Sequence, residues 1–197
     1  MKKVISVVLA IIMLCSVTLN SEILAFASTL GELSNGINYS FDESIGELVL
    51  SGQGKVTQIY NGWQNYQNID IKSVVIKNGI TEIGNSAFAD CSNLQKLILP
   101  NDLESIGEFA FYNCTNLKNL SLPESLTQIG ECAFEYCNLS SVYVPNNNAH
   151  IGKYAFLSDN ENPIILCNST VQFDDDYNTV YYIDKSVSVK NFKDLYQ

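Results

Sequence analysis

The sequence predicts an α/β solenoid of about five coils, each 22–23 residues long, stacked around one apolar core. Two observations predict this class. A short motif returns at a nearly constant spacing, and an apolar pattern repeats in phase with that motif. Such self-similarity is typical of repeat architectures, in which each coil covers the apolar face of its neighbour. We therefore expect one parallel sheet, built from one strand per coil.

The recurring motif is Ile-Gly-x-x-Ala-Phe, where x is any residue. It occurs four times, starting at Ile83, Ile106, Ile129 and Ile151, and the starts are 23, 23 and 22 residues apart. One such coil cannot fold alone, since ordering its backbone costs roughly 1–2 kcal/mol per residue, whereas each buried apolar side chain returns about 1.5–3 kcal/mol. Contacts between stacked coils must supply the difference.

Each coil divides into a strand, an inward bend and a turn, as the second coil illustrates. Leu97 and Leu99 are two residues apart, which is the spacing of side chains on one face of a strand. Pro100 follows, and because proline has no N–H to donate to a β-ladder, it ends the strand. The next apolar pair, Leu103 and Ile106, brings the chain back toward the core. A glycine then permits the bend into a short helical turn carrying the Ala-Phe pair. We expect the phenylalanines at this phase to be buried equivalents: Phe88, Phe111 and Phe134.

Together these residues resemble the BspA-type leucine-rich repeat family, whose units read L-x-x-I-x-L-P followed by L-x-x-I-G-x-x-A-F-x-x-C. Residues 94–114 and 117–137 match this pattern almost position for position, and the match runs from about Ile71 to Phe156. The resemblance implies a right-handed leucine-rich-repeat stack with its parallel sheet on the concave side. It also implies a protein that acts by binding a partner.

The segments that flank the repeats resemble the terminal caps of this family. Residues 28–70 form the predicted N-terminal β cap, with a β-hairpin at residues 37–52 and Trp63 packed near it. Residues 71–167 form the predicted solenoid, whose last coil departs from the motif after Leu157. Residues 168–197 form the predicted C-terminal cap, with a closing strand near residues 180–183 and a short helix. Large aromatics suit caps, which hide the open ends of a stack.

The first 27 residues predict a signal peptide. Lys2 and Lys3 precede an apolar run that begins at Val4, and residues 25–27 (Ala-Phe-Ala) offer the small-x-small pattern of a cleavage site. The mature chain then starts at Ser28. We therefore expect a bacterial protein that is secreted or associated non-covalently with the cell surface, without insertion into the membrane after cleavage.

The charge of the chain argues against two classes of partner. The formal net charge is −10 and becomes −11 once Lys2, Lys3 and Glu22 are removed with the signal peptide. An acidic protein of this kind is repelled by nucleic acid and by anionic membranes. The partner we expect is an extracellular protein, of a host or of a bacterial surface.

Three cysteines recur with the repeat and are the first candidates for chemistry. Cys91, Cys114 and Cys137 are 23 residues apart, so their Cα atoms should lie roughly 5 Å apart, a distance that a disulfide can span. A ladder of buried thiols is the alternative, because free cysteine packs well as a small apolar residue. Five cysteines remain after signal cleavage, an odd number. We predict unpaired thiols.

The other candidate groups predict neither catalysis nor metal or cofactor binding. His150 is the only histidine, and the repeat places it where other coils carry solvent-facing residues. Asp174, Asp175 and Asp176 lack the spaced ligands of a calcium loop and are typical of a solvated turn. The sequence contains no G-x-S-x-G, phosphate-binding glycine loop or C-x-x-C pair. We therefore predict no catalytic residue, no metal and no cofactor.

The candidate binding surface is the outward side of the predicted strands. Side chains alternate along a strand, so if Leu97 faces the core its neighbours on both sides face outward. Corresponding residues of the other coils form columns on the same surface. The predicted partner-binding residues are Lys96, Ile98, Asn119, Ser121, Ser141, Tyr143 and Ile165.

Two interpretations of that surface remain open at this stage. Exposed Val, Ile and Tyr beside polar residues are the composition of a protein-binding patch. Alternatively, β-branched residues are there because they suit strands. The function we predict is an adhesin-like, secreted protein-binding module without catalysis. The alternative is a structural component of the cell envelope that binds wall material.

Overall fold

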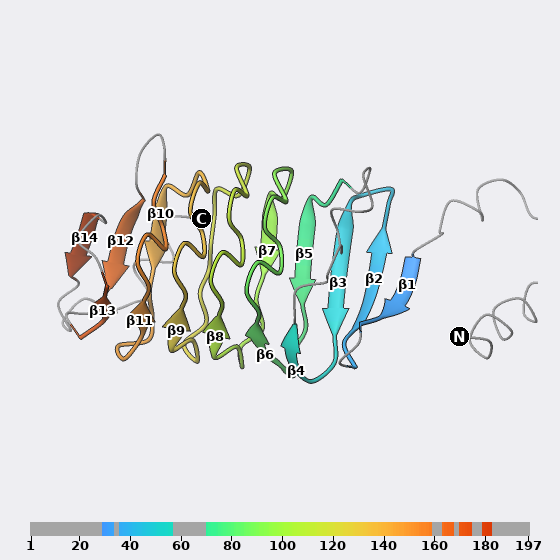
Figure 1. Ribbon diagram of the computed structural model, residues 1–197, viewed down its shortest axis with the longest axis horizontal. Coiled ribbons are helices and arrows are strands. Elements are labelled where there is room, and N and C mark those ends of the chain that lie inside the picture. Colours follow the sequence, from blue (N-terminus) through green and yellow to red (C-terminus); the bar gives the residue numbers. More distant parts are fainter. Residues whose placement is uncertain are drawn as a thin grey trace, which may run out of the picture.

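The computed structural model describes residues 29–33, 36–56, 70–158, 163–167, 170–174 and 179–182. The strands lie side by side along the long axis of the molecule, as expected of stacked coils (Figure 1). The predicted signal peptide, Trp63 and the predicted capping helix lie outside the described residues.

The first sheet has five strands in the order β1-β2-β3-β5-β7. Their bounds are Thr29–Glu32 for β1, Asn38–Asp42 for β2, Glu47–Ser51 for β3, Ser73–Ile76 for β5 and Lys96–Ile98 for β7. Strands β1, β2 and β3 pair antiparallel, which confirms the predicted N-terminal hairpin, and β3-β5-β7 pair in parallel. The strand that closes the hairpin therefore also begins the parallel stack.

A second group of parallel strands continues the same side of the stack. It consists of β10 (Ser141–Tyr143), β12 (Ile164–Cys167) and β14 (Thr179–Tyr182), and β14 confirms the predicted closing strand. In the coil between β7 and β10, the isolated bridge from Ser121 to Tyr143 stands in place of a strand. The strand side of the solenoid is thus one surface with an irregular middle coil.

A second sheet, which the sequence analysis missed, lies where we expected only an inward bend. Its six strands are all parallel, in the order β13-β11-β9-β8-β6-β4. They span Gly54–Val56 (β4), Ile80–Ile83 (β6), Ser105–Ile106 (β8), Gln128–Ile129 (β9), His150–Ile151 (β11) and Gln172–Phe173 (β13). Strands of two to four residues are too short to show the alternation that identifies a strand in sequence.

The predicted helical turns are not formed, and the described residues contain no helix. In the first turn the N–H groups of Ser86, Phe88 and Asp90 donate to carbonyls of the next coil at 2.8 Å. An α-helix would use these donors within its own turn. The turns instead stack as a further ladder between coils, so the described part of the chain is a β-solenoid rather than an α/β one.

The core confirms the predicted phenylalanine column. Phe88, Phe111, Phe134 and Phe156 are at most 1% exposed. Successive rings stack nearly parallel, with centroids 5.1, 5.1 and 5.5 Å apart. These centroid distances are close to the spacing between adjacent strands of a sheet, about 4.8 Å, so each ring packs on the ring of the next coil along the solenoid axis.

The glycine of the motif is required for a reason other than the predicted one. Gly107, Gly130 and Gly152 do not adopt a positive φ, so conformational freedom does not explain them. A Cβ on Gly130 would lie 2.5 Å from the backbone nitrogen of Glu108 and 2.7 Å from the carbonyl carbon of Gly107. Glycine is present because the backbones of adjacent coils approach closely at this point.

Candidate functional site

The candidate site is the strand face, which we define as the outward side of β3, β5, β7, residues 119–121, β10 and β12. Four of the predicted binding residues are exposed there: Lys96, Ile98, Asn119 and Ser121. Ser141 and Tyr143 are half-buried on the same face. The structure therefore brings six of the seven predicted residues together on one surface.

The predicted placement of Ile165 on this face is wrong, because Ile165 is completely buried. It pairs in register with the buried Val142, whereas Tyr143 pairs with Leu166. The prediction assumed 22 residues between coils at this point, and the actual spacing is 23. The neighbouring Ile164 is the outward residue, 40% exposed. Aligning Ile165 with Val142 in the sequence would have revealed this.

An apolar stripe runs across the strand face. Val49 pairs with Val75 and Val75 with Ile98, so these side chains follow one another at about the 4.8 Å strand spacing. Ile98 is 41% exposed, and Val49 and Val75 are half-buried. Val49 extends the stripe beyond the predicted site, because the hairpin strand β3 is also the first parallel strand of the stack.

Polar groups border the stripe on the neighbouring column. Ser73 Oγ donates a hydrogen bond of 3.3 Å to Glu47 Oε2. On its other side Ser73 pairs in register with Lys96. Partial burial, with a smaller contribution from Glu124, raises the pKa of Tyr143 above its ordinary value. Tyr143 therefore stays a neutral hydroxyl that can donate one hydrogen bond at neutral pH.

The outward side of the second sheet is polar along its whole length. In register, it carries Lys55, Glu82, Ser105, Gln128, His150 and Gln172. Lys55 forms an ion pair with Glu82, and His150 Nε2 lies 2.8 Å from Asp174 Oδ1. His150 is on the surface as predicted, with its side chain 44% exposed. Asp175 and Asp176 lie outside the described residues.

The recurring cysteines line the interior as free thiols. Cys114 and Cys137 are buried, Cys91 is half-buried, and each buried thiol donates to a backbone carbonyl of the preceding coil, Phe88 or Phe111. Burial raises the pKa of Cys91 to about 12. A hydrogen bond with Cys137, together with burial, raises that of Cys114 as well. Cys91 and Cys114 are therefore poor nucleophiles and poor metal ligands at neutral pH.

The described part of the chain shows neither a cluster of metal ligands nor a membrane-spanning helix. Nowhere in residues 29–182, apart from the gaps given above, do three His, Cys, Asp or Glu side chains gather as a metal site. None of the described segments is a helix long and apolar enough to cross a bilayer.

Comparison with known proteins now places the chain in a family. The family model of the BspA-type leucine-rich repeat region matches residues 37–177 in six copies. The chain belongs to the BspA-type leucine-rich repeat family. The BspA-type repeats thus extend beyond the stretch from Ile71 to Phe156 in which the motif is recognisable by eye. No curated protein matches the sequence.

Solved structures share the architecture. A leucine-rich repeat protein from Eubacterium ventriosum is 25% identical, with a TM-score of 0.67 over 77% of this chain and 41% of that chain. The leucine-rich repeat protein of T. pallidum is 22% identical, with a TM-score of 0.51 over 69% of this chain and 71% of that one. This BspA-type chain thus spans less than half the length of the Eubacterium protein.

Proposed function

We propose that this chain is a secreted or surface-associated module that binds an extracellular protein through the strand face. The supporting observation is the stripe of Val49, Val75 and Ile98 with Tyr143 beyond it, in which Ile98 is exposed and the other three are half-buried, bordered by hydroxyls and a lysine. Apolar and aromatic groups supply the buried centre of an interface, and a polar rim supplies its specificity.

A parallel ladder suits this role, because recognition is most precise on side chains that a scaffold holds in place. The strands below the stripe are hydrogen-bonded on both sides at β3 and β5, and the inward residues Val74 and Leu97 are buried. Little conformational entropy is then lost when a partner binds.

The test is capture by the purified protein of defined fractions, host extracellular matrix proteins on one side and bacterial wall on the other. A variant with Ile98→Ser and Tyr143→Ala should lose capture of the protein fraction, and Gln128→Ala on the second sheet should not. Capture of wall polymer alone would favour the structural envelope role instead. Undiminished capture by the double variant would refute the strand face as the site.

A further inference from the structure

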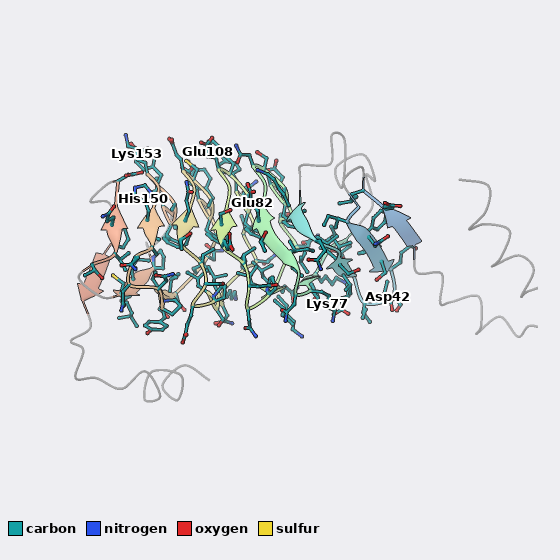
Figure 2. All side chains as sticks on the ribbon, turned by 90° about the horizontal axis from the view of Figure 1, so that it is seen from below. Asp42, Lys77, Glu82, Glu108, His150 and Lys153 are labelled. Carbon is teal, nitrogen blue, oxygen red and sulfur yellow. The ribbon has the colours of Figure 1, made fainter. Side chains whose placement is uncertain are left out.

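The four stacked turns carry a second surface that is separate from the strand face. We define the turn face as the outward side chains of residues 84–90, 107–113, 130–136 and 152–158. The inward side chains of these turns form the phenylalanine column, whereas the outward ones change from coil to coil. Glu108 and Lys153 lie along the same edge of the stack (Figure 2).

Aromatic rings gather on the turn face. The rings of Phe109 and Tyr112 meet edge to face with centroids 5.7 Å apart, and Tyr112 meets Tyr136 in the next coil in the same way at 5.4 Å. Phe109 is 38% exposed, and Tyr112, Tyr136 and Tyr154 are half-buried. Exposed aromatic clusters of this kind mark interaction sites on soluble proteins.

Several of these aromatics occupy strained backbone positions. Phe109, Tyr136 and Tyr154 have φ values of 55°, 60° and 58°, where an L-residue with a bulky side chain is rarely found. Asn113, at the position equivalent to Tyr136 one coil earlier, has the same conformation with a φ of 58°. Asparagine tolerates this region at lower cost, so the fold itself does not require the rings.

The charge of the turn face selects the kind of partner. The exposed carboxylates of the four turns are those of Asp90, Glu108 and Glu131, against one basic side chain, that of Lys153. Lys153 Nζ lies 4.6 Å from the centroid of the Tyr154 ring. The face therefore already holds one ammonium group against an aromatic ring, the arrangement in which a cation is attracted by the ring quadrupole.

From this combination we infer that the turn face binds a basic protein segment, whose Lys or Arg side chains lie on the rings of Phe109, Tyr112 and Tyr136. The neighbouring carboxylates neutralise the incoming cations, and the rings cover the apolar parts of their side chains. The same carboxylates repel anionic polymers. The turn face is thus a docking site that operates independently of the strand face.

The experiment measures binding of a short alternating Arg-Gly peptide to the purified protein by fluorescence anisotropy at low salt. The double variant Phe109→Asn, Tyr136→Asn leaves the net charge unchanged and uses a residue that suits the backbone. It should weaken binding about fivefold or more. Glu108→Gln with Glu131→Gln should weaken binding as well. The control, Glu43→Gln with Glu104→Gln, removes the same charge elsewhere and should change binding much less.

Three outcomes would overturn the inference. Equal binding by the parent and the Asn double variant would show that the rings are not used. Equal loss in the two charge-matched pairs would show attraction to net charge alone. Binding of a neutral chito-oligosaccharide in place of the peptide would identify a glycan site. Thermal melts of each variant separate these outcomes from unfolding, and capture through the strand face should be unaffected throughout.

Discussion

The four turns carry a buried position and a more variable one, and their side chains differ in how strictly they repeat. The inward position is phenylalanine in every coil: Phe88, Phe111, Phe134 and Phe156. Two residues earlier stand Ser86, Phe109, Cys132 and Tyr154, of which Phe109 is exposed, Ser86 and Tyr154 are half-buried and Cys132 is buried. Each inward ring must fill the same volume between identical neighbours, whereas the position two residues earlier accepts side chains of different size because it borders solvent in most coils. The comparison teaches that positions with the same residue in every coil belong to the core, whereas positions with varying residues are those at which a binding surface can evolve.

The sharpest way to break this comparison is to remove one inward ring. Phe111→Ala should lower the free energy of unfolding by about 3–5 kcal/mol, because the cavity lies between two stacked rings and cannot collapse. Denaturant unfolding measures it. Phe109→Asn, two residues earlier in the same turn, is the matched control and should change stability by about 0.5 kcal/mol or less. Equal effects of the two substitutions would contradict the distinction between inward and outward positions.

A second test concerns the close approach of the coils at the motif glycine. Gly130→Ala should cost about 1–3 kcal/mol, because the added Cβ would meet the backbone of residues 107 and 108, which cannot move without separating the coils. Thermal unfolding is the measurement, with Glu131→Ala as the adjacent exposed control. A stable Gly130→Ala protein would show that the stack tolerates wider spacing than the structure indicates.

The strand face offers a substitution that should affect binding without affecting the fold. Tyr143→Ala should weaken capture of the partner by about 2 kcal/mol, because tyrosine buries a large rigid surface and keeps a polar contact. Its melting temperature should remain close to that of the parent. Surface plasmon resonance on the captured fraction measures the first quantity and calorimetry the second. A large drop in melting temperature would assign Tyr143 to the scaffold rather than to the binding surface.

The thiols give a smaller, pH-dependent effect. The pKa of Cys91 is raised from 9.0 to about 12 in the folded protein, so its unfolded thiol ionises first. The contribution of Cys91 to stability is therefore complete below pH 9 and is lost as the pH rises toward 12. Native alkylation of Cys91 should be slow at pH 8 and fast after denaturation. Mass spectrometry under denaturing, non-reducing conditions should find no disulfide among Cys91, Cys114 and Cys137, and a bridged pair would contradict this prediction.

The parts of the structure that were predicted correctly are those that a residue pattern within a single coil identifies. The alternation around Leu97 predicted β7, and the fixed phase of the Ala-Phe pair predicted the buried column. The second sheet was missed because β8 and β9 are only two residues long and become strands through pairing with adjacent coils. Ile165 was misplaced because the 22-residue spacing from Ser121 to Tyr143 was carried into the next coil, where the spacing is 23, and an error of one residue exchanges inward and outward positions.

The aromatic turn face could not be predicted for a different reason. Phe109 and Tyr112 looked like ordinary variable positions, and nothing in their local sequence shows that Tyr136 of the next coil lies beside them. One signal was available: Phe109 is a large apolar residue where the other coils carry Ser86, Cys132 and Tyr154. Laying the coils in register would have placed Phe109 and Tyr154 in one column, whereas Tyr112 and Tyr136 occupy other columns and meet only in the folded stack.

The sequence by itself determined the period, the residues that face the core and the family, because those depend on spacing along one chain. Only the tertiary structure decided that the turns form a hydrogen-bonded ladder between coils rather than helices. Their N–H groups can donate to carbonyls of the next coil only once that coil is in place. The tertiary structure also decided why Gly130 is glycine and which surface residues become neighbours. Contacts between coils join residues 22 or 23 positions apart, and those distances exist only after the coils have stacked.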